Sequence, residues 1–450
     1  MEVGIIAKPR TFKYGGIHPP ENKITANKPI IDLKTPEKIV VHLSQHTGLP
    51  AKPVVNKGDY VKTGQIIGEA DGFISANIHS PVSGKIQKID LEPDYSGYKK
   101  LAITIETQGD EWLDDIDNTN NIIEECNLSP QEIIEKIKKA GIVGLGGAMF
   151  PSHVKLSIPP GKSIDTLIIN GVECEPYLTA DHRLMLEKGK EIIIGIRILK
   201  KALNVKNVFI GIELNKIECI NYLASLLDLN NEIKIIPLKV KYPQGGEKQL
   251  IQAITGREVP PGGLPADVGV VVFNVATTFA IYEAVQKNKP LIERIITVTG
   301  KCLENPINIR ARIGTPINKL LEAAGAKVQN IRKLIVGGPM MGRAIDNFEA
   351  PVLKGTSGIL VFGEDDALRN PHKSCIRCAR CVQSCPMHLE PYLLMTLAER
   401  KLFEKLKNNN VTDCIECGSC SYICPSSRPL LDYIRYGKIN VINLIRSKKL

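Results

Sequence analysis

The stretch "CIRCARCVQSCP", residues 375–386, sets three cysteines two residues apart, a fourth after a gap of three, and a proline directly behind it. A near copy, "CIECGSCSYICP", follows at 414–425. The spacing C-x2-C-x2-C-x3-C-P is a ligand run for paired [4Fe-4S] clusters, in which the fourth thiolate binds the other cluster. The two runs hold eight of the chain's 12 cysteines, so they predict two clusters with crossed ligands.

The crossed arrangement defines two ligand sets. Cluster 1 takes Cys375, Cys378, Cys381 and Cys424, and cluster 2 takes Cys414, Cys417, Cys420 and Cys385. The alternative is a pair of zinc sites, which is less favoured because zinc ribbons use paired C-x2-C knuckles. Apolar residues recur at helical spacing between the runs, which predicts a helical ferredoxin domain over 360–430. The other cysteines are predicted to be small buried residues: Cys126, Cys174, Cys219 and Cys302.

Length and charge narrow the class of protein. A chain of 450 residues is too long for one core, so several domains are expected. The net charge of +10 favours an acidic protein partner or an anionic lipid surface, and no nucleic-acid-binding signature accompanies it. The apolar stretch 268–282 is shorter than a spanning helix requires, and the N-terminus has no signal-peptide pattern. We therefore expect no transmembrane helix and a cytoplasmic location.

The N-terminal part of the chain reads as short strands separated by glycine turns. Residues 35–108 carry these strands and predict a small β-barrel or sandwich, assigned to a domain over 1–112. The stretch resembles the biotinyl/lipoyl carrier fold, a barrel-sandwich hybrid. Its hairpin reads "GEADGFISAN", 68–77, and has no lysine to modify, so a swinging-arm function is not expected.

After an acidic linker at 114–126, helices alternate with buried apolar strands, which predicts a parallel sheet over 126–265. "SPQEIIEKIKKAG", 129–141, is predicted to be a helix with a serine N-cap that stops at Gly141. A second stretch, 266–355, reads as strands plus one helix of ubiquitin-like, β-grasp size. The fold class is thus multidomain α/β and α+β.

Four glycine- or asparagine-bearing turns lie where such a sheet would bind a ligand. "GLGGAMFPSHVKL" (144–156) offers bare backbone amides, although alone it is also compatible with an ordinary turn. "IINGVECEPYLTADHRL" (168–184) and "VVFNVATT" (271–278) follow buried strands, and "YPQGGEKQ" (242–249) adds a second glycine turn. Open α/β sheets bind ligands at the carboxyl ends of their strands, so these turns predict one site.

These motifs resemble the flavin- and NADH-binding subunit of respiratory complex I. With the N-terminal "TFKYGGIHPPENK" (11–23) and the cysteine runs, the whole chain resembles the C subunit of the Rnf ion-translocating ferredoxin:NAD oxidoreductases. The resemblance implies a Rossmann-like FMN domain, an SLBB-like β-grasp domain, and non-covalent FMN lined by Gly144, Gly146, Gly147, Lys155, Asn170, Glu173, Asn274 and Thr277. It also implies that Phe150 stacks on the nicotinamide nucleotide and that Glu175 and Glu247 border its pocket.

Two functions remain open from the sequence. The first is a redox subunit in which hydride passes between NAD(H) and FMN and single electrons pass to the two clusters, with no catalytic side chain because the chemistry is on FMN. The second is an electron-transfer adaptor that feeds a soluble reductase with a lapsed flavin site. The resemblance implies other Rnf membrane and ferredoxin-like subunits as partners, contact with ferredoxin directly or through a neighbour, and peripheral attachment to the cytoplasmic face of the cell membrane.

The C-terminal stretch 431–450 is basic and amphipathic. Such a tail could lie on anionic lipid or dock on a partner, or it could be an ordinary helix packed on the ferredoxin domain.

Overall fold

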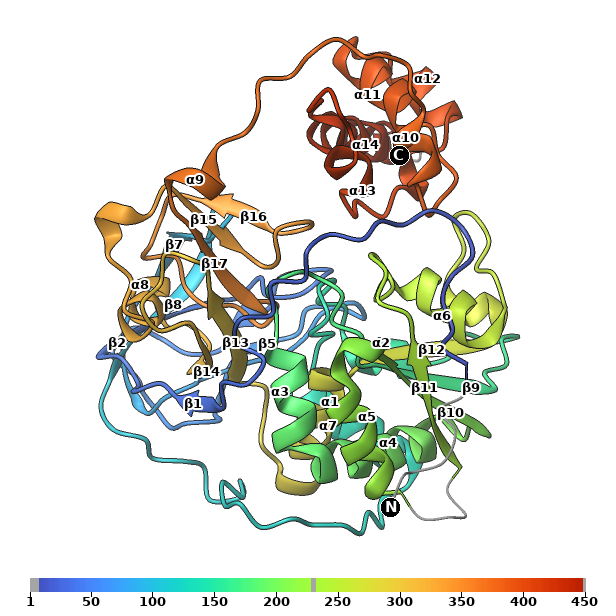
Figure 1. Cartoon of the computed structure of the whole chain (residues 1–450). Coiled ribbons are helices and arrows are strands. Elements are labelled where there is room, and N and C mark those ends of the chain that lie inside the picture. Colours follow the sequence, from blue (N-terminus) through green and yellow to red (C-terminus); the bar gives the residue numbers. More distant parts are fainter. Residues whose placement is uncertain (1–7, 228–231, 448–450) are drawn as a thin grey trace.

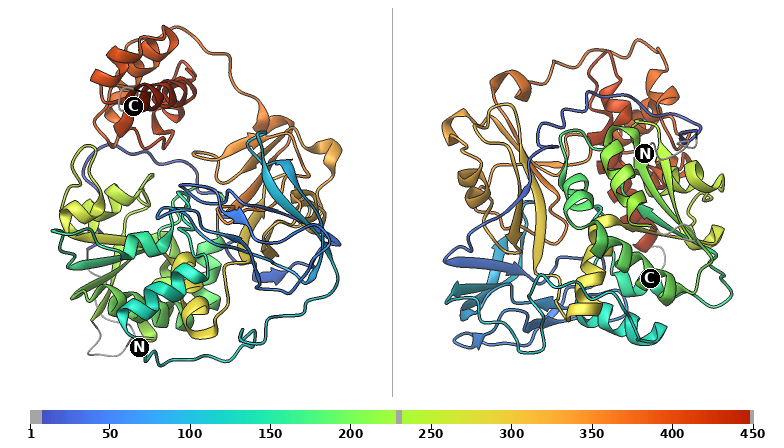
Figure 2. Two further views of the ribbon diagram at one scale, coloured as in Figure 1. Left: turned by 180° about the vertical axis from the view of Figure 1, so that it is seen from behind. Right: turned by 60° about the horizontal axis from the view of Figure 1, so that its bottom comes forward.

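The computed structural model describes residues 8–227 and 232–447 (Figure 1). Four packed parts follow the chain: a β-rich N-terminal part, an α/β domain, a mixed β-sheet domain and a helical C-terminal module, the last joined by a long extended linker (Figures 1 and 2). No helix within the described ranges is long and apolar enough to cross a membrane.

The α/β domain is built on four parallel strands. They are β9 (Thr166–Asn170), β10 (Asn207–Glu213), β11 (Ile233–Leu238) and β12 (Val270–Asn274), in the order β11-β10-β9-β12. One face packs on α1 (Pro130–Lys139), α3 (Ala180–Glu187), α4 (Gly189–Leu203), α5 (Ile217–Ser225) and α7 (Val275–Lys287). The other face packs on α6 (Glu247–Thr255). The predicted serine cap is present, since Ser129 and Glu132 form a reciprocal capping box at the start of α1.

The predicted boundary at residue 266 is wrong. The sequence pattern placed the start of a second α/β stretch at residue 266, but β12 pairs with β9 in the parallel sheet and α7 packs on that sheet. A buried apolar strand followed by a helix has the same pattern in either neighbouring domain, so its pairing could not be read from periodicity. The α/β domain therefore extends through α7.

The next sheet has mixed strand directions. It contains β13 (Glu293–Thr299), β14 (Ile307–Arg312), β15 (Lys333–Val336), β16 (Arg343–Ile345) and β17 (Gly358–Phe362), in the order β14-β13-β17-β15-β16. Helix α8 (Ile317–Ala323) packs against it, and the first and last of these strands along the chain, β13 and β17, are parallel. The strands with one packed helix match the predicted composition, but the predicted end at 355 and the predicted start of the ferredoxin domain at 360 are wrong, because β17 pairs with β13 and β15 in this sheet.

The N-terminal β part consists of two small sheets around a common core. Strands β2 (Lys38–His42), β8 (Lys99–Thr107), β7 (Gly84–Pro93) and β4 (Tyr60–Val61) form one, and β3 (Lys52–Pro53), β5 (Ile66–Glu69) and β6 (Ile78–His79) form the other. The predicted domain 1–112 needs a correction at its start. Strand β1 (Ile30–Asp32) pairs with β14 of the mixed sheet, and residues 10–23 lie against the α/β domain.

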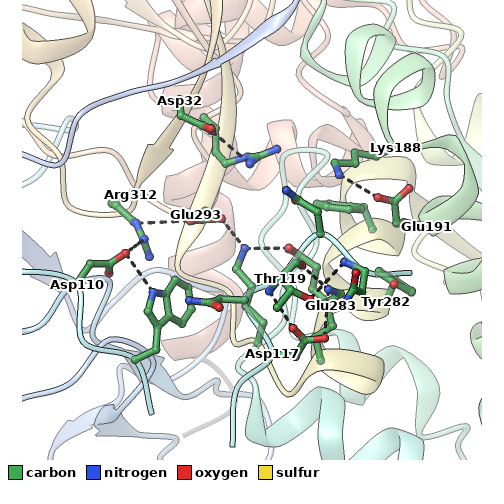
Figure 3. Close-up of a pocket in the computed structure, with 18 of the residues that line it drawn as sticks. Asp32, Asp110, Asp117, Thr119, Lys188, Glu191, Tyr282, Glu283, Glu293 and Arg312 are labelled. Carbon is green, nitrogen blue, oxygen red and sulfur yellow. Dashed lines mark hydrogen bonds and ion pairs between the residues drawn. The ribbon is translucent and has the colours of Figure 1, made fainter. Parts of the chain in front are cut away.

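A cluster of charged residues joins the linker after the barrel to the two sheet domains (Figure 3). Arg312 lies 4.9 Å from the Trp112 ring and bonds Asp110 at 2.8 Å, and Lys289 bonds Glu283 and Glu293 at 2.9 and 2.7 Å. Because Lys289 pairs with Glu283 of α7 and with Glu293 of β13, the cluster fixes the mixed sheet against the α/β domain.

The C-terminal module is helical, as expected from the periodicity between the cysteine runs. After α9 (Glu364–Ala367) and the linker come α10 (Arg380–Gln383), α11 (Pro391–Glu399), α12 (Phe403–Asn408), α13 (Ser419–Tyr422) and α14 (Leu430–Ser447). Helix α14 is not a separate tail. Ile434 and Val441 are buried in the module's core, and Gly437 lies so close to α11 that a Cβ there would be 2.9 Å from the Cβ of Ala398. The packed-helix alternative therefore holds for α14, and residues 448–450 lie outside the described ranges.

Candidate flavin site and iron–sulfur centres

The glycine loop between α1 and α2 (Ser152–Leu156) is fixed at its base and open at its tip. Gly144 donates its amide to the carbonyl of Phe150 at 2.9 Å, and the amide of Leu145 donates to Thr277 Oγ1 at 2.8 Å. Gly147 has φ +131°, and a Cβ placed on it would meet no atom within 4 Å. The tip therefore presents bare backbone beside open space, which suits the close approach of a flat ring or a phosphate.

Two asparagines end neighbouring strands at this loop. Asn170 closes β9 and Asn274 closes β12, at the point where the strand order reverses direction, which is the usual ligand position in open α/β sheets. Asn274 caps α7 by accepting from the amides of Ala276 and Thr277, and a Cβ on Gly146 would lie 3.2 Å from the Cβ of Asn274. Asn274 and Thr277 thus shape the loop from behind.

Lys155 links the first glycine turn to the second. Its Nζ donates to Glu247 Oε1 at 2.8 Å and to the carbonyl of Val272 at 2.9 Å. Asn170 Nδ2 donates to the carbonyl of Gly245 at 2.9 Å. The structure therefore brings together the sequence motifs that surround positions 146, 155, 170, 247 and 274, with Phe150 half-buried at the end of the loop.

The two glutamates of the β9 turn face the protein interior. Glu173 accepts from the amides of Asp181 and His182 at 2.8 and 3.0 Å, so it caps the start of α3. Glu175 accepts from the amides of Met340 and Met341 at 3.1 and 2.8 Å. Burial raises the pKa of the Glu175 carboxyl to about 7. Both carboxylates are thus engaged in holding the turn, and Glu175 ties it to the mixed-sheet domain.

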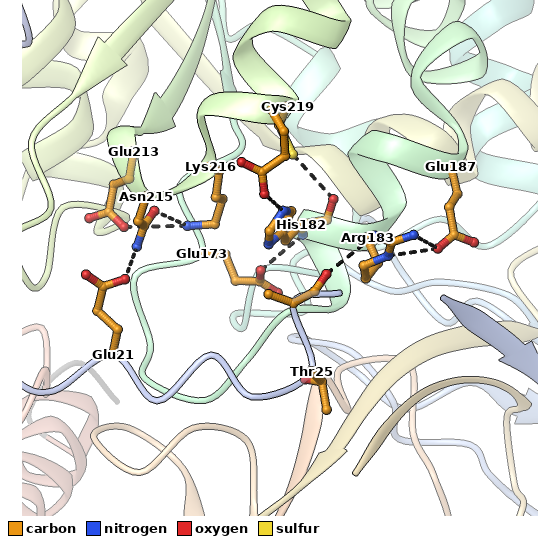
Figure 4. A network of polar contacts seen from close by, with 12 residues as sticks. Glu21, Thr25, Glu173, His182, Arg183, Glu187, Glu213, Asn215, Lys216 and Cys219 are labelled. Atoms are coloured by element: carbon orange, nitrogen blue, oxygen red, sulfur yellow. Dashed lines mark hydrogen bonds and ion pairs between the residues drawn. The ribbon is translucent and has the colours of Figure 1, made fainter. Parts of the chain in front are cut away.

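Two lysines that the sequence patterns did not single out clamp the same turn, and Figure 4 shows one of them, Lys216. Lys216, 1% exposed, donates to the carbonyl of Val172 at 2.8 Å. Lys23 donates to the carbonyls of Glu173, Glu175 and Leu178 at 2.6–2.9 Å, and burial lowers its pKa to about 8. Lys23 is the last residue of the N-terminal motif 11–23, and that motif was the feature of the sequence that could have pointed to it.

The two cysteine runs adopt the same local backbone. Arg377 and Glu416, the residues before the second cysteine of each run, have φ +56° and +57°, and each donates its amide to the first cysteine Sγ at 3.4 Å. The residues after the second cysteine, Ala379 and Gly418, are also left-handed, with φ +58° and +77°. Each run therefore folds its three thiolates into one concave loop with amides directed at sulfur.

The sulfurs gather in the crossed groups that the spacing predicts. One pocket is lined by Cys375, Cys378, Cys381 and Cys424. In the other group, burial raises the pKa values of Cys385, Cys414, Cys417 and Cys420, and neighbouring thiols raise those of Cys385, Cys414 and Cys420 further. No three His, Cys, Asp or Glu side chains in the described ranges converge as they would on a single ion.

The two groups differ in their surroundings. Cys375 and Cys378 are exposed, whereas Cys417 and Cys420 are buried at 8% exposure. The Tyr242 hydroxyl, from the turn after β11, donates to the carbonyl of Cys417 at 2.7 Å, and Cys417 packs with Tyr242 and Ile17. The second group therefore lies against the α/β domain, and the first faces outward.

Comparisons with known proteins assign a class to each part. The Nuo51 FMN-binding domain matches residues 137–283, the RnfC barrel sandwich hybrid domain 11–110, the SLBB domain 295–344 and the 4Fe-4S dicluster domain 367–425. A solved NAD+-reducing [NiFe]-hydrogenase shares the fold with TM-score 0.52 at 17% identity, over 70% of this chain and 63% of that one. The chain is thus an oxidoreductase component with an FMN-binding domain and two [4Fe-4S] clusters.

Two full-length relatives make the assignment more specific. The C subunit of the proton-translocating ferredoxin:NAD(+) oxidoreductase complex of Clostridium ljungdahlii is 47% identical over 94% of this chain and 93% of its own length. The Na(+)-translocating counterpart of Acetobacterium woodii is 44% identical over 96% of this chain and 97% of its own length. The chain belongs to the family of C subunits of ion-translocating ferredoxin:NAD(+) oxidoreductase complexes, and the resemblance stated from the sequence is confirmed.

Proposed function

We propose that this chain exchanges hydride between NAD(H) and FMN and single electrons between FMN and two [4Fe-4S] clusters, as a peripheral subunit of an Rnf-type complex. The observation that carries the proposal is the packing of the Cys417 loop on the α/β domain, through Tyr242, next to the turns that end β9 and β11. Bound FMN supplies the conversion between a hydride and single electrons, because nicotinamides transfer two electrons together and [4Fe-4S] clusters one.

For the flavin, the backbone of Gly146 and Gly147 provides the cradle, and Lys155 and Asn170 border it. Gly144, Thr277 and Asn274 hold the loop, and Glu173 holds the β9 turn, through the hydrogen bonds described above. Glu247 pairs with Lys155 at the edge of the site. The nucleotide would reach the open side of the loop at Gly147, beside Phe150. Glu175, which is tied to Met340 and Met341, then positions the turn rather than touching the nucleotide.

For the clusters, we assign cluster 1 to the exposed group and cluster 2 to the group against the α/β domain. Cluster 1 has Cys375, Cys378, Cys381 and Cys424, and cluster 2 has Cys414, Cys417, Cys420 and Cys385. Cluster 2 is then the neighbour of the flavin and cluster 1 the exchange point with a partner.

The partner surface is the exposed linker loop around cluster 1. Residues 368–380 are all exposed, and they contain four basic residues and no acidic one. Leu368 and Ile376 are 78% and 67% exposed, and within the described part of the chain Lys373, Arg377 and Arg380 have no ion-pair partner. A loop that carries the exposed Ile376 among basic residues fits an acidic, iron–sulfur-bearing neighbour such as a ferredoxin-like subunit or ferredoxin itself. We expect attachment to the cytoplasmic face of the membrane to come from such subunits rather than from α14, because α14 is packed in the module.

The visible spectrum of the anaerobically purified full chain tests the function. We expect flavin bands and an iron–sulfur shoulder, both bleached by NADH. An iron–sulfur shoulder without flavin, bleached only by dithionite, would instead support the adaptor that feeds a soluble reductase.

A further inference from the structure

The N-terminal segment Arg10–His18, here called the strap, lies between the α/β domain and the ferredoxin module (Figures 1 and 2). Its sequence motif has no role in the function proposed above. On one side it continues the edge of the parallel sheet: the Arg10 amide donates to the carbonyl of Pro237 at 3.0 Å, and Ile17 exchanges two backbone hydrogen bonds of 2.9 Å with Tyr242.

Side chains fix the strap on that domain. Phe12 is 1% exposed, and Lys241 Nζ lies 4.0 Å from its ring centroid. Thr11 Oγ1 donates to Gln244 at 2.8 Å, and the Lys13 amide donates to Gln252 at 3.0 Å. The strap therefore forms part of the α/β domain's surface, although the domain's own strands begin only at β9, far along the chain.

The opposite side of the strap touches the chain at Cys385, the crossing ligand of cluster 2. The Gly16 amide donates to the carbonyl of Ser384 at 2.9 Å, and the Tyr14 ring lies 4.2 Å from the His388 ring. Gly15 has φ +66°, and a Cβ there would lie 2.6 Å from the carbonyl carbon of Cys385. Only glycine allows the two backbones to approach this closely.

Cluster 2 is thus held toward the α/β domain from both of its cysteine runs. Tyr242 contacts the run at 414–425 through Cys417, and the strap, which pairs with Tyr242 through Ile17, contacts the run at 375–386 next to Cys385. Two further contacts support the same docking: the Gly262 amide donates to Asp413 at 3.0 Å, and Gln249 approaches Met387 Sδ at 3.2 Å.

We propose that Gly15 and Gly16 are positioning residues for electron transfer: the strap sets the position of cluster 2 relative to the flavin site through the backbone of Ser384 and Cys385. This inference rests on the proposed function for its electron donor. It differs from that function in assigning the alignment of the two domains to the strap rather than to the cluster ligands or the glycine loop.

The test compares Gly15→Ala with Gly97→Ala in the full chain. Gly97 also has a positive φ, +81°, but a Cβ there meets no atom within 4 Å, so this control carries the same backbone strain without the contact. After anaerobic mixing with NADH, flavin and cluster bleaching are followed separately. For Gly15→Ala we expect normal FMN and iron content, a normal rate of flavin bleaching, and cluster bleaching slowed several-fold relative to Gly97→Ala, since the displaced backbone of Cys385 moves cluster 2 away from the flavin site.

Tyr14→Ala decides the matter if Gly15→Ala does not fold, because it removes the contact with His388 from a side chain that is 63% exposed. We expect a smaller slowing of cluster bleaching with unchanged flavin bleaching. Cluster bleaching in both variants at the rate of Gly97→Ala would overturn the proposal.

A second readout separates this inference from the proposed function. If NADH bleaches nothing in the unmodified chain, the function fails, and hydrogen exchange still tests the strap. The Gly16 amide, bonded to the Ser384 carbonyl, should be protected in the unmodified chain and in Gly97→Ala and should lose protection in Gly15→Ala, whereas the Ile17 amide, bonded to Tyr242, should stay protected in all three. Equal protection of the Gly16 amide in all three proteins would overturn the strap's docking role.

Discussion

The two cysteine runs have the same spacing and the same backbone, yet they lie in opposite environments. The left-handed residues at 377 and 379 match those at 416 and 418, and the amide-to-sulfur contacts match as well. However, Cys375 and Cys378 are exposed, while Cys417 is buried against the α/β domain and Cys420 is buried in the core of the module. The ligand motif therefore determines the cluster, and the residues outside it determine what that cluster can exchange electrons with.

The same contrast orders the cofactors. A cluster whose loop packs on the flavin domain is placed for exchange within the chain, and a cluster in an exposed basic loop is placed for exchange with another protein. We infer that electrons pass in the order FMN, cluster 2, cluster 1 and partner, or in the reverse order. Each of the following changes acts at one point of this electron path.

The largest effect is expected where both clusters depend on the same group. Gly147→Val adds a branched side chain to the open space of the loop at a residue with φ +131°, where such a side chain is strained. We expect loss of FMN and of NADH-driven bleaching of both clusters, with normal iron content and normal reduction by dithionite. The control is Gly97→Val. Stoichiometric FMN in the Gly147 variant would show that the loop does not cradle the flavin.

The next change should separate the two clusters. Cys385→Ser removes a thiolate of the first run, but the crossed arrangement predicts loss of the cluster bound mainly by the second run. EPR of the reduced protein, assigned with Cys378→Ser and Cys417→Ser, measures this, and Cys424→Ser should give the reverse pattern. Should Cys385→Ser remove the same signal as Cys378→Ser, the ligands are not crossed.

The sequence predicted most of the parts and few of their contacts. The spacing of the runs, the serine N-cap at Ser129 and the turns after β9 and β12 are local patterns, and the structure places them as expected. The clamp by Lys23 and the approach of Gly15 to Cys385 join residues about 150 and 370 positions apart. No periodicity encodes such pairs, so the strap and the pairing of β12 became visible only in three dimensions.

A similar limit applies to the two glutamates of the β9 turn, whose orientation the sequence does not show. Their motif indicated a ligand site, but a carboxylate can equally satisfy backbone amides, which cost free energy when buried without a partner. Glu173 and Glu175 do so for Asp181, His182 and the Met340 turn. Sequence alone could place them at the site without showing which way they face.

A moderate effect is expected at the exposed cluster. Reversing Arg377 and Arg380 to glutamate should slow electron exchange with an acidic ferredoxin-like partner by about tenfold at low salt, and added salt should reduce the difference. NADH-driven bleaching within the isolated chain should not change. The control reverses Lys405 and Lys407 on α12, which gives the same net charge away from cluster 1. An equal slowing in the control would assign the effect to overall charge rather than to this loop.

The smallest effect is expected at the contact between cluster 2 and the α/β domain. Tyr242→Phe removes the hydroxyl that donates to the carbonyl of Cys417 at 2.7 Å, in a side chain that is 2% exposed. Because the lost hydrogen bond leaves a buried carbonyl without this donor, the free energy of unfolding should fall by about 1 kcal/mol. The EPR signal and reduction potential of cluster 2 should change while those of cluster 1 stay fixed, since hydrogen bonding near a cluster tunes its potential. Tyr98→Phe, at a 74% exposed side chain, is the matched control and should change none of these quantities. If the two clusters shifted together in Tyr242→Phe, the tyrosine would be acting on the whole module, and the difference between the buried and exposed clusters would have to arise from their own loops.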